Sequence, residues 1–177
     1  MRKGGGKEKG SGFEREVSRL IDVWWEEEKS TFWRTVISGG WVEPGDITPR
    51  HRPGKPAIWF PFIIECKCVK KVDVLELLTK KKNKTLLSWW AQVTREREEA
   101  VEQGRLKEEL IRLVIFKRNG SPIFVMFEDT KIYPFIAPLD AIVYEKYGLA
   151  ICTWATFSTQ VTKNKVYKLY GKEEQAK

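Results

Sequence analysis

The chain has 177 residues, a formal net charge of +8 and 12% aromatic residues. This length fits one well-buried domain, and the positive charge favours a polyanionic partner, either nucleic acid or an acidic membrane surface. No apolar stretch approaches the roughly 20 residues that span a bilayer, and the first residues hold no apolar signal core, so we expect a soluble, cytoplasmic protein without a membrane partner.

The beginning of the chain is rich in glycine and lysine. Residues 1–12 hold too few apolar side chains to pack, so they predict a flexible basic arm. Residues 13–177 are then expected to form a single domain, with a C-terminal extension after about residue 130. From Phe13 the apolar residues recur at three- and four-residue steps, which predicts an amphipathic helix that continues to about Lys29.

Three segments between the first helix and the middle of the chain are expected to frame a site. Residues 31–37 alternate and are β-branched enough for a strand, which ends at Ser38. Residues 48–56 are basic and rich in proline, so they predict a loop that is neither helix nor central strand. Residues 57–69 are mainly apolar and aromatic and predict a buried strand.

The second half of the chain begins with a predicted helix over residues 85–103, where apolar residues return to helical spacing. Residues 110–116 and 123–127 flank Asn119-Gly120, a strong hairpin signal, and predict two antiparallel strands. Together these elements predict an α/β fold with a central mixed β-sheet flanked by α-helices.

Predictions for the last part of the chain rest on shorter patterns. We expect a short helix over residues 140–147 and strands over residues 150–157 and 166–170. The sequence contains no dinucleotide-binding or Walker phosphate loop, because Gly4-Gly5-Gly6 lacks the strand and helix that such loops need. We therefore expect no nucleotide cofactor.

Two short motifs carry the chemistry of the chain. Asp46 follows a Pro-Gly turn, and Glu65-Cys66-Lys67 lies near the end of the predicted buried strand. Because side chains alternate along a strand, Glu65 and Lys67 share one face and Cys66 lies on the other. Two carboxylates beside an ammonium group can bind a divalent cation and position a water for phosphodiester hydrolysis. The alternatives are that Asp46 is only a turn residue and that the Glu-x-Lys pair marks a strand end in solvent.

The cysteines indicate a reducing compartment, because their number is odd and fits poorly with a disulfide framework. Zinc ligation by Cys66, Cys68, Cys152 and His51 is an alternative. The Cys-x-Cys spacing lacks a second pair of ligands, so the better interpretation is that the cysteines are small buried residues.

Several motifs follow one another along the chain. They are Lys9-Gly10-x-x-x-Glu14-Arg15-Glu16, Arg34, Ser38-Gly39, Gly45-Asp46-Ile47 and Ile64-Glu65-Cys66-Lys67. In this order they resemble archaeal-type Holliday junction resolvases, which belong to the PD-(D/E)xK nuclease superfamily. The resemblance covers roughly residues 9–127, and the long loop over residues 48–56 and the segment after residue 130 depart from it. It implies a restriction-endonuclease-like nuclease core, Mg²⁺ as the cofactor with Mn²⁺ as a substitute, and a homodimer.

The resemblance also implies roles for the central motif residues. Asp46 and Glu65 would bind Mg²⁺, with the backbone carbonyl of Cys66 as a further ligand. Lys67 would orient the attacking water and offset the charge that develops on the phosphorane.

Three further positions complete the implied catalytic set. Glu14 would join the acidic cluster as a metal ligand, and its alternative is a capping box with Ser11 at the start of the first helix. Ser38 resembles a serine that resolvases hold near the scissile phosphate, although serine is equally common in turns. Gln92 resembles a glutamine beside the metal site of many superfamily members, and its alternative is a solvent-facing helical residue.

Basic side chains are expected to contact DNA along its phosphates, and their alternative is a solvated surface with weak ion pairs. Trp41 and Trp59 flank the Asp46 loop and are candidates for stacking on unpaired bases. The predicted DNA-binding residues are Arg2, Lys3, Lys7, Lys9, Arg15, Arg34, Arg50, Arg52, Lys70, Lys71, Lys80, Lys81, Lys82 and Lys84.

The function predicted from these residues and from the resemblance is Mg²⁺-dependent, structure-selective cleavage of DNA. The expected substrate is branched DNA, specifically a four-way junction that a homodimer resolves by paired nicks, and the expected source is a phage. Two alternatives stay open: another PD-(D/E)xK nuclease that acts on ends or linear duplex, and a DNA-binding module that has lost cleavage. The clustered acids argue against the second, since they would repel DNA.

Overall fold

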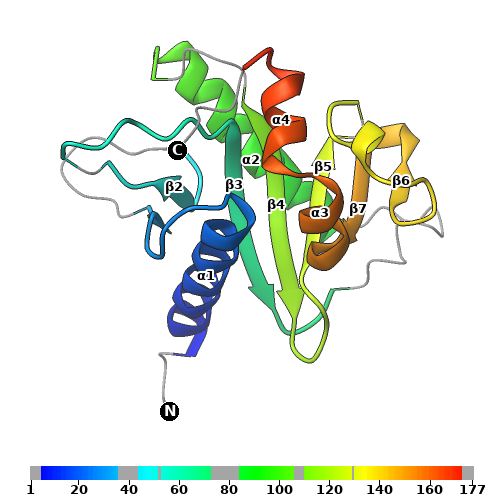
Figure 1. The fold of residues 1–177 in the computed structure, drawn as a ribbon. Coiled ribbons are helices and arrows are strands. Elements are labelled where there is room, and N and C mark those ends of the chain that lie inside the picture. The colour runs from blue at the N-terminus through cyan, green and yellow to red at the C-terminus, as the bar shows by residue number, and fades with distance from the viewer. Residues whose placement is uncertain are drawn as a thin grey trace.

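The computed structural model describes residues 5–35, 44–51, 53–72, 84–105, 110–128 and 130–172. In these residues a five-stranded mixed sheet stands between helices, and a two-stranded ribbon lies beside it (Figure 1). This architecture confirms the predicted α/β class with a central mixed sheet flanked by helices.

The helices and strands follow one another with short connections. They are α1 (Gly5–Trp24), β1 (Phe32–Arg34), β2 (Ile47–Pro49), β3 (Phe62–Val69), α2 (Lys84–Glu102), β4 (Ile111–Arg118), β5 (Phe124–Glu128), the 3₁₀ turn Tyr133–Phe135, β6 (Ile142–Tyr144), the 3₁₀ turn Glu145–Tyr147, β7 (Leu149–Thr153), α3 (Trp154–Gln160) and α4 (Lys163–Leu169).

The strands of the central sheet follow the order β3-β4-β5-β7-β6. β3 and β4 run parallel, and parallel neighbours need a crossover such as the one α2 provides. β4 and β5 form the predicted antiparallel hairpin, and β7 pairs antiparallel with both β5 and β6. β3 therefore lies at one edge of the sheet, next to the β1–β2 ribbon.

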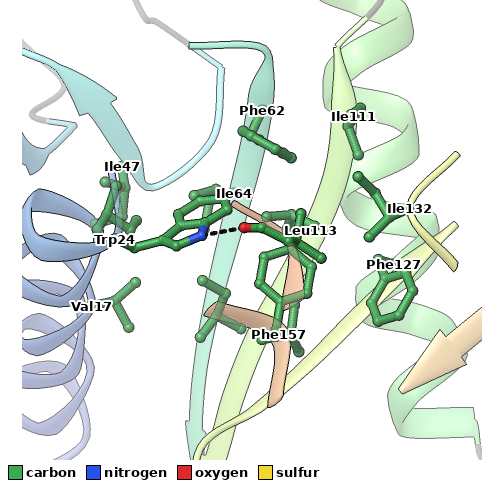
Figure 2. Packing of buried hydrophobic residues seen from close by; sticks show 14 of the residues in the cluster. Val17, Trp24, Ile47, Phe62, Ile64, Ile111, Leu113, Phe127, Ile132 and Phe157 are labelled. Atoms are coloured by element: carbon green, nitrogen blue, oxygen red, sulfur yellow. Dashed lines mark hydrogen bonds between the residues drawn. The ribbon is translucent and has the colours of Figure 1, made fainter. Parts of the chain in front are cut away.

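Apolar stripes on the helices bury both faces of the sheet. α1, α3 and α4 cover one face, where Trp24, Phe62 and Phe157 belong to one buried cluster (Figure 2). The Trp24 indole Nε1 also donates to the carbonyl oxygen of Val161 at 2.6 Å, which ties α1 to the end of α3. α2 covers the opposite face, where its Leu86 joins a second buried cluster.

The first helix begins earlier than predicted. α1 starts at Gly5, so the prediction of a flexible arm is wrong for residues 5–12, which are helical. Residues 1–4 lie outside the described part of the chain. Once the packed turns of α1 exist, each added residue gains a hydrogen bond without a new nucleation cost, and this extends the helix into a glycine-rich segment.

The first helix also ends earlier, at Trp24 rather than near Lys29. The carboxylate of Asp22 accepts hydrogen bonds from the backbone N–H groups of Ser30 and Phe32, both at 2.8 Å. Asp22 therefore holds a turn that redirects the chain into β1. Three consecutive glutamates after the helix also disfavour its extension, because negative charge opposes the dipole at a helix C-terminus.

The predicted elements in the middle of the chain are confirmed with shifted bounds. The strand expected over residues 31–37 is described as Phe32–Arg34, and the strand expected over residues 57–69 is Phe62–Val69. The helix expected over residues 85–103 is Lys84–Glu102.

Two predictions in the last part of the chain are wrong. Residues 166–170 belong to α4 rather than to a strand, and the strand expected over residues 150–157 ends at Thr153, where α3 begins. Both helices start at a threonine cap: the hydroxyl of Thr153 accepts from the N–H of Thr156, and that of Thr162 accepts from the N–H of Lys165.

The helix expected over residues 140–147 is also wrong, because β6 and a 3₁₀ turn occupy this range. The segment after residue 130 thus supplies β6 and β7 to the central sheet. Among the described helices, none combines the length and the apolar character that crossing a bilayer requires.

Candidate active site

A tight turn brings Asp46 against the open edge of β3. Gly45 has a φ of +83°, and a Cβ at this position would lie 2.8 Å from the carbonyl oxygen of Ile64, so only glycine fits this close approach. The N–H of Asp46 donates to the same carbonyl at 2.6 Å. The Oδ2 atom of Asp46 accepts from the N–H of Cys66 at 2.7 Å. Asp46 is therefore attached to β3 through both its backbone and its side chain.

Glu65 and Lys67 lie on the face of β3 that α2 covers. Ile63, two residues before Glu65, packs in the cluster with α2, whereas Cys66 packs in the cluster with α1, so the predicted alternation is confirmed. The Nζ atom of Lys67 donates to Oε1 of Glu65 and, at 3.0 Å, to Oε1 of Gln92. An ammonium group is thus fixed between the strand and the helix.

Gln92 lies in this network, not in open solvent. Its Nε2 atom donates to Oε1 of Glu65 at 2.9 Å and to Oε1 of Glu96 at 3.0 Å. Because both carboxylates accept from the NH₂ group, the carbonyl oxygen of the amide must point to Lys67. The interpretation of Gln92 as a solvent-facing residue is therefore wrong.

A separate polar cluster holds α2 at a fixed position on the sheet. Arg112 of β4 forms an ion pair with Glu128 of β5, and its Nη1 atom donates to the hydroxyl of Thr94 at 2.7 Å. The same guanidinium lies 4.8 Å from the ring centroid of Trp90. These contacts fix the helix that positions Gln92.

Glu14 lies on α1, and its Oε2 atom is 2.6 Å from Nε of Arg34 on β1. Ser11 lies well inside α1, which starts at Gly5, so the capping-box alternative for Glu14 is wrong, since an N-cap precedes the first helical turn. The ion pair places Arg34 beside Glu14 at the ribbon.

Burial raises the pKa values of both central carboxyl groups. The pKa of Glu65 rises from 4.5 to about 7, because burial disfavours the charged form and the charge of Asp46 adds to this, while the hydrogen bond from Lys67 opposes it. Burial also raises the pKa of Asp46, against the hydrogen bond from Cys66, and the charge of Glu14 adds to the rise. Facing carboxyl groups with raised pKa values are more typical of functional sites than of structural ion pairs.

A family model for phage putative PDDEXK endonucleases matches residues 5–168. The chain belongs to this family. The matched range includes Asp46 and the Glu65-x-Lys67 motif, and it extends through β6, β7, α3 and most of α4. Comparisons with curated proteins and with solved structures find no match. Family membership supports an endonuclease of the PD-(D/E)xK superfamily with a phage origin.

Nucleases of this superfamily usually use a divalent metal, and the oxygen donors at the edge of β3 fit one. Asp46 and Glu65 supply carboxylates. The carbonyl of Cys66 projects from the same edge, because the N–H of that residue already reaches Asp46 and the two groups point the same way in a strand. Such hard oxygen ligands suit Mg²⁺ or Mn²⁺.

A third acidic ligand is not in place. Within the described ranges, no three His, Cys, Asp or Glu side chains lie close enough together to hold a metal ion. The carboxylate of Glu14 pairs with Arg34 instead of joining Asp46 and Glu65. Metal binding by Glu14 stays a prediction.

Several predicted site residues lie outside the part of the chain that the structure describes. Ser38 is one of them, and the predicted DNA-binding residues among them are Arg2, Lys3, Arg52, Lys80, Lys81 and Lys82. Lys7, Lys9 and Lys84 lie in helices, but their side chains are also outside the description. Arg15, Arg50, Lys70 and Lys71 are exposed, as phosphate contacts require.

The cysteines and Trp59 have structural environments. Burial raises the pKa of Cys66 well above its usual value and that of Cys152 to about 12, so both thiols stay protonated, which argues against zinc ligation. Trp59, a candidate for base stacking, packs edge-on against Tyr167 and Tyr170, with ring centroids 4.9 and 5.2 Å apart. The base-stacking prediction for Trp59 therefore finds no support.

Sequence reasoning missed Glu96. A signal was present, because Glu96 follows Gln92 by four residues on a helix and side chains at this spacing are neighbours. Its charge also contributes to the raised pKa of Glu65, after burial and the charge of Asp46. Glu96 is an additional acidic group of the site.

The raised pKa of Glu65 predicts an unusual pH dependence of stability for the metal-free protein. In the unfolded chain Glu65 ionises near its ordinary pKa of 4.5, whereas in the folded chain it ionises near 7. The folded state therefore binds more protons between these values, and its stability falls as pH rises through this interval. In EDTA, Glu65→Gln should match the original protein at pH 4.5 and exceed its free energy of unfolding at pH 8 by up to about 3 kcal/mol.

Thermal and urea denaturation at the two pH values measure this difference. Glu98→Gln is the matched control, because Glu98 is an exposed residue of α2. It should change stability little at either pH. An equal effect of Glu65→Gln at pH 4.5 and pH 8 would contradict the assigned cause.

Proposed function

We propose that this endonuclease is Mg²⁺-dependent and structure-selective, and that it resolves four-way DNA junctions by paired nicks. The observation that carries the proposal is the convergence of Asp46, Glu65 and Lys67 at the edge of β3. The phage endonuclease family supports the cleavage reaction, and the order of motifs that resembles junction resolvases supports the substrate. A phage enzyme of this kind would act in the cytoplasm of its host.

Each side chain has a role that follows from its contacts. A bound divalent cation would polarise the scissile phosphate and activate a water. Asp46, Glu65 and the carbonyl of Cys66 would hold it at the edge of β3. Lys67, held by Gln92, presents its ammonium group where negative charge develops on the phosphate in the transition state.

The ion pair between Glu14 and Arg34 gives both residues a proposed place in the reaction. Glu14 would act as a further metal ligand once Arg34 turns to a DNA phosphate, because a phosphate competes directly for the guanidinium. Ser38 is proposed as a contact to the scissile phosphate on the basis of the motif order alone.

A homodimer is part of the proposal, because two symmetric nicks need two active sites. The net charge of +8 favours binding to the phosphates of several DNA arms. The exposed Arg15, Arg50, Lys70 and Lys71 are the described side chains proposed for this contact.

A different substrate preference within the same superfamily is the competing function, for example cleavage of DNA ends or of linear duplex. Loss of catalysis is the weaker alternative. Asp46 and Glu65 are buried close to each other with raised pKa values, which destabilises the fold without a bound cation and repels DNA. A binding module would gain nothing from this arrangement.

The deciding experiment compares a synthetic four-way junction, a splayed duplex and a linear duplex under identical conditions, with Mg²⁺ or with EDTA. We expect paired, symmetric nicks close to the crossover of the junction, slow or absent cutting of linear duplex, and no cutting in EDTA. Strand-specific end labels on a denaturing gel locate both nicks.

Three results would argue against the proposal. Equal cutting of junction and linear duplex would exclude junction selectivity. Cutting in EDTA would exclude the metal-dependent reaction. Light scattering that finds only monomers on the junction would exclude paired nicks by a homodimer.

A further inference from the structure

The ribbon beside the active site carries a solvent-exposed tryptophan. Trp33 of β1 is 44% exposed, although leaving an indole in water forgoes much of the free energy that its burial would contribute. The guanidinium of Arg50, directly after β2, lies 4.8 Å from the centroid of its ring. The catalytic network described above uses neither side chain.

Trp33 and Asp46 lie on the same face of the ribbon. β1 and β2 are antiparallel, with Trp33 opposite Thr48. One step further along, the N–H of Thr35 donates to the carbonyl oxygen of Asp46 at 2.8 Å, so the pairing continues to the catalytic residue. Side chains two positions apart on a strand, and those directly opposite across strands, share a face.

The other face of the ribbon points toward the protein. Phe32 lies in the buried cluster with α1, and Arg34 pairs with Glu14 of α1. Trp33, between them, therefore points away from α1. Its exposure follows from the register of the ribbon, since a shift by one residue would bury the indole and expose Phe32.

The distance along the ribbon matches the spacing of nucleotides. Two positions along a strand span about 7 Å, and neighbouring nucleotides of one DNA strand are about 3.4 Å apart along a duplex. A phosphate held at Asp46 would thus place a base one or two nucleotides away beside Trp33.

We propose that Trp33 and Arg50 form a stacking platform for one unpaired nucleobase next to the bond that is cut. This inference rests on the proposed DNA cleavage and adds to it a selectivity for DNA with an unpaired nucleotide beside the scissile phosphate. A paired base stays stacked inside the duplex, whereas an unpaired base can turn out and stack on an indole. Arg50 adds a cation beside the ring and the DNA backbone.

The bland alternative is that Trp33 only stabilises the ribbon through its cross-strand contact with Thr48. Such a contact contributes to stability but not to any distinction between DNA forms. The two explanations therefore differ in binding selectivity, which can be measured without cleavage.

The test measures binding in EDTA to two duplexes that differ only in one unpaired 2-aminopurine, a fluorescent adenine analogue. Trp33→Ala should weaken binding to the duplex with the unpaired base by between about 5-fold and about 150-fold, the range for stacking one base on an aromatic side chain. Binding to the fully paired duplex should stay within about 2-fold. The original protein should quench the unpaired 2-aminopurine, and Trp33→Ala should remove that quenching.

Two further variants separate stacking from folding. Trp33→Phe should recover part of the affinity, because phenylalanine keeps an aromatic ring. Leu169→Ala is the matched control, since Leu169 of α4 is also 44% exposed; it should bind both duplexes like the original protein. Melting temperatures of all variants check that the fold is retained.

The inference fails if the original protein binds both duplexes equally, or if Trp33→Ala weakens both to the same extent. Since the measurement needs no cleavage, these outcomes are distinct from a failure of the proposed junction resolution. A protein that discriminates unpaired bases but cuts linear and branched DNA equally would retain the platform and lose the junction assignment.

Discussion

Asp46→Asn and Glu65→Gln should each reduce Mg²⁺-dependent DNA cleavage by about 1000-fold or more. Each substitution keeps the shape of the side chain but removes one of the two carboxylates attached to the edge of β3, and with it a negatively charged ligand for the cation. The expected loss is at the upper end of the range for removing one group that stabilises the charged transition state. Single-turnover cleavage of a labelled junction measures it.

DNA binding should survive both substitutions. Removing a carboxylate that faces DNA lowers the repulsion of phosphates, so affinity in EDTA should be equal or higher. Glu98→Gln removes the same charge from an exposed position of α2 and should cleave within about 2-fold of the original rate. Normal cleavage by Asp46→Asn would place the metal site elsewhere.

Gly45→Ala should remove most of the activity and destabilise the protein, although it changes no catalytic group. The Cβ would lie 2.8 Å from the carbonyl oxygen and 3.0 Å from the nitrogen of Ile64, at a φ of +83° that suits only glycine. The turn must move, and it carries Asp46 away from β3. We expect a loss of about 2–4 kcal/mol in the free energy of unfolding, from backbone strain together with overpacking.

Gly120→Ala is the matched control for the backbone strain. Gly120 has a φ of +72°, but no heavy atom lies within 4 Å of the position a Cβ would take. It should cost only about 1 kcal/mol and leave cleavage unchanged. If the two variants lose equal stability and both keep full activity, the close contact between Gly45 and β3 does not position Asp46.

Much of the fold could be predicted because its elements have strong local patterns. α2 shows apolar residues at helical spacing, and β4 and β5 flank Asn119-Gly120, where Gly120 has the positive φ that such a turn needs. α4 was missed because residues 166–170 are too few for periodicity to separate a strand from a helix. Its threonine cap at Thr162 was visible in the sequence and would have indicated the helix.

The candidate site divides in the same way. The shared face of Glu65 and Lys67 follows from the two-residue period of a strand, and the chemistry of the motif follows from the residue types. The partners of these residues do not, because Gln92 and Glu96 reach them through the packing of α2 on the sheet. Ser38 and the predicted lysine contacts at residues 80–82 stay predictions.

The sequence by itself determined the α/β class, the Asp and Glu-x-Lys motif and the basic charge, since these depend on residue types and on periods within one element. Only the tertiary structure decided that Asp46 attaches to the edge of β3, that Glu14 pairs with Arg34, and that Trp33 is exposed. Each of these depends on which strands become neighbours and in which register. Those contacts join residues distant in sequence, and no local pattern encodes them.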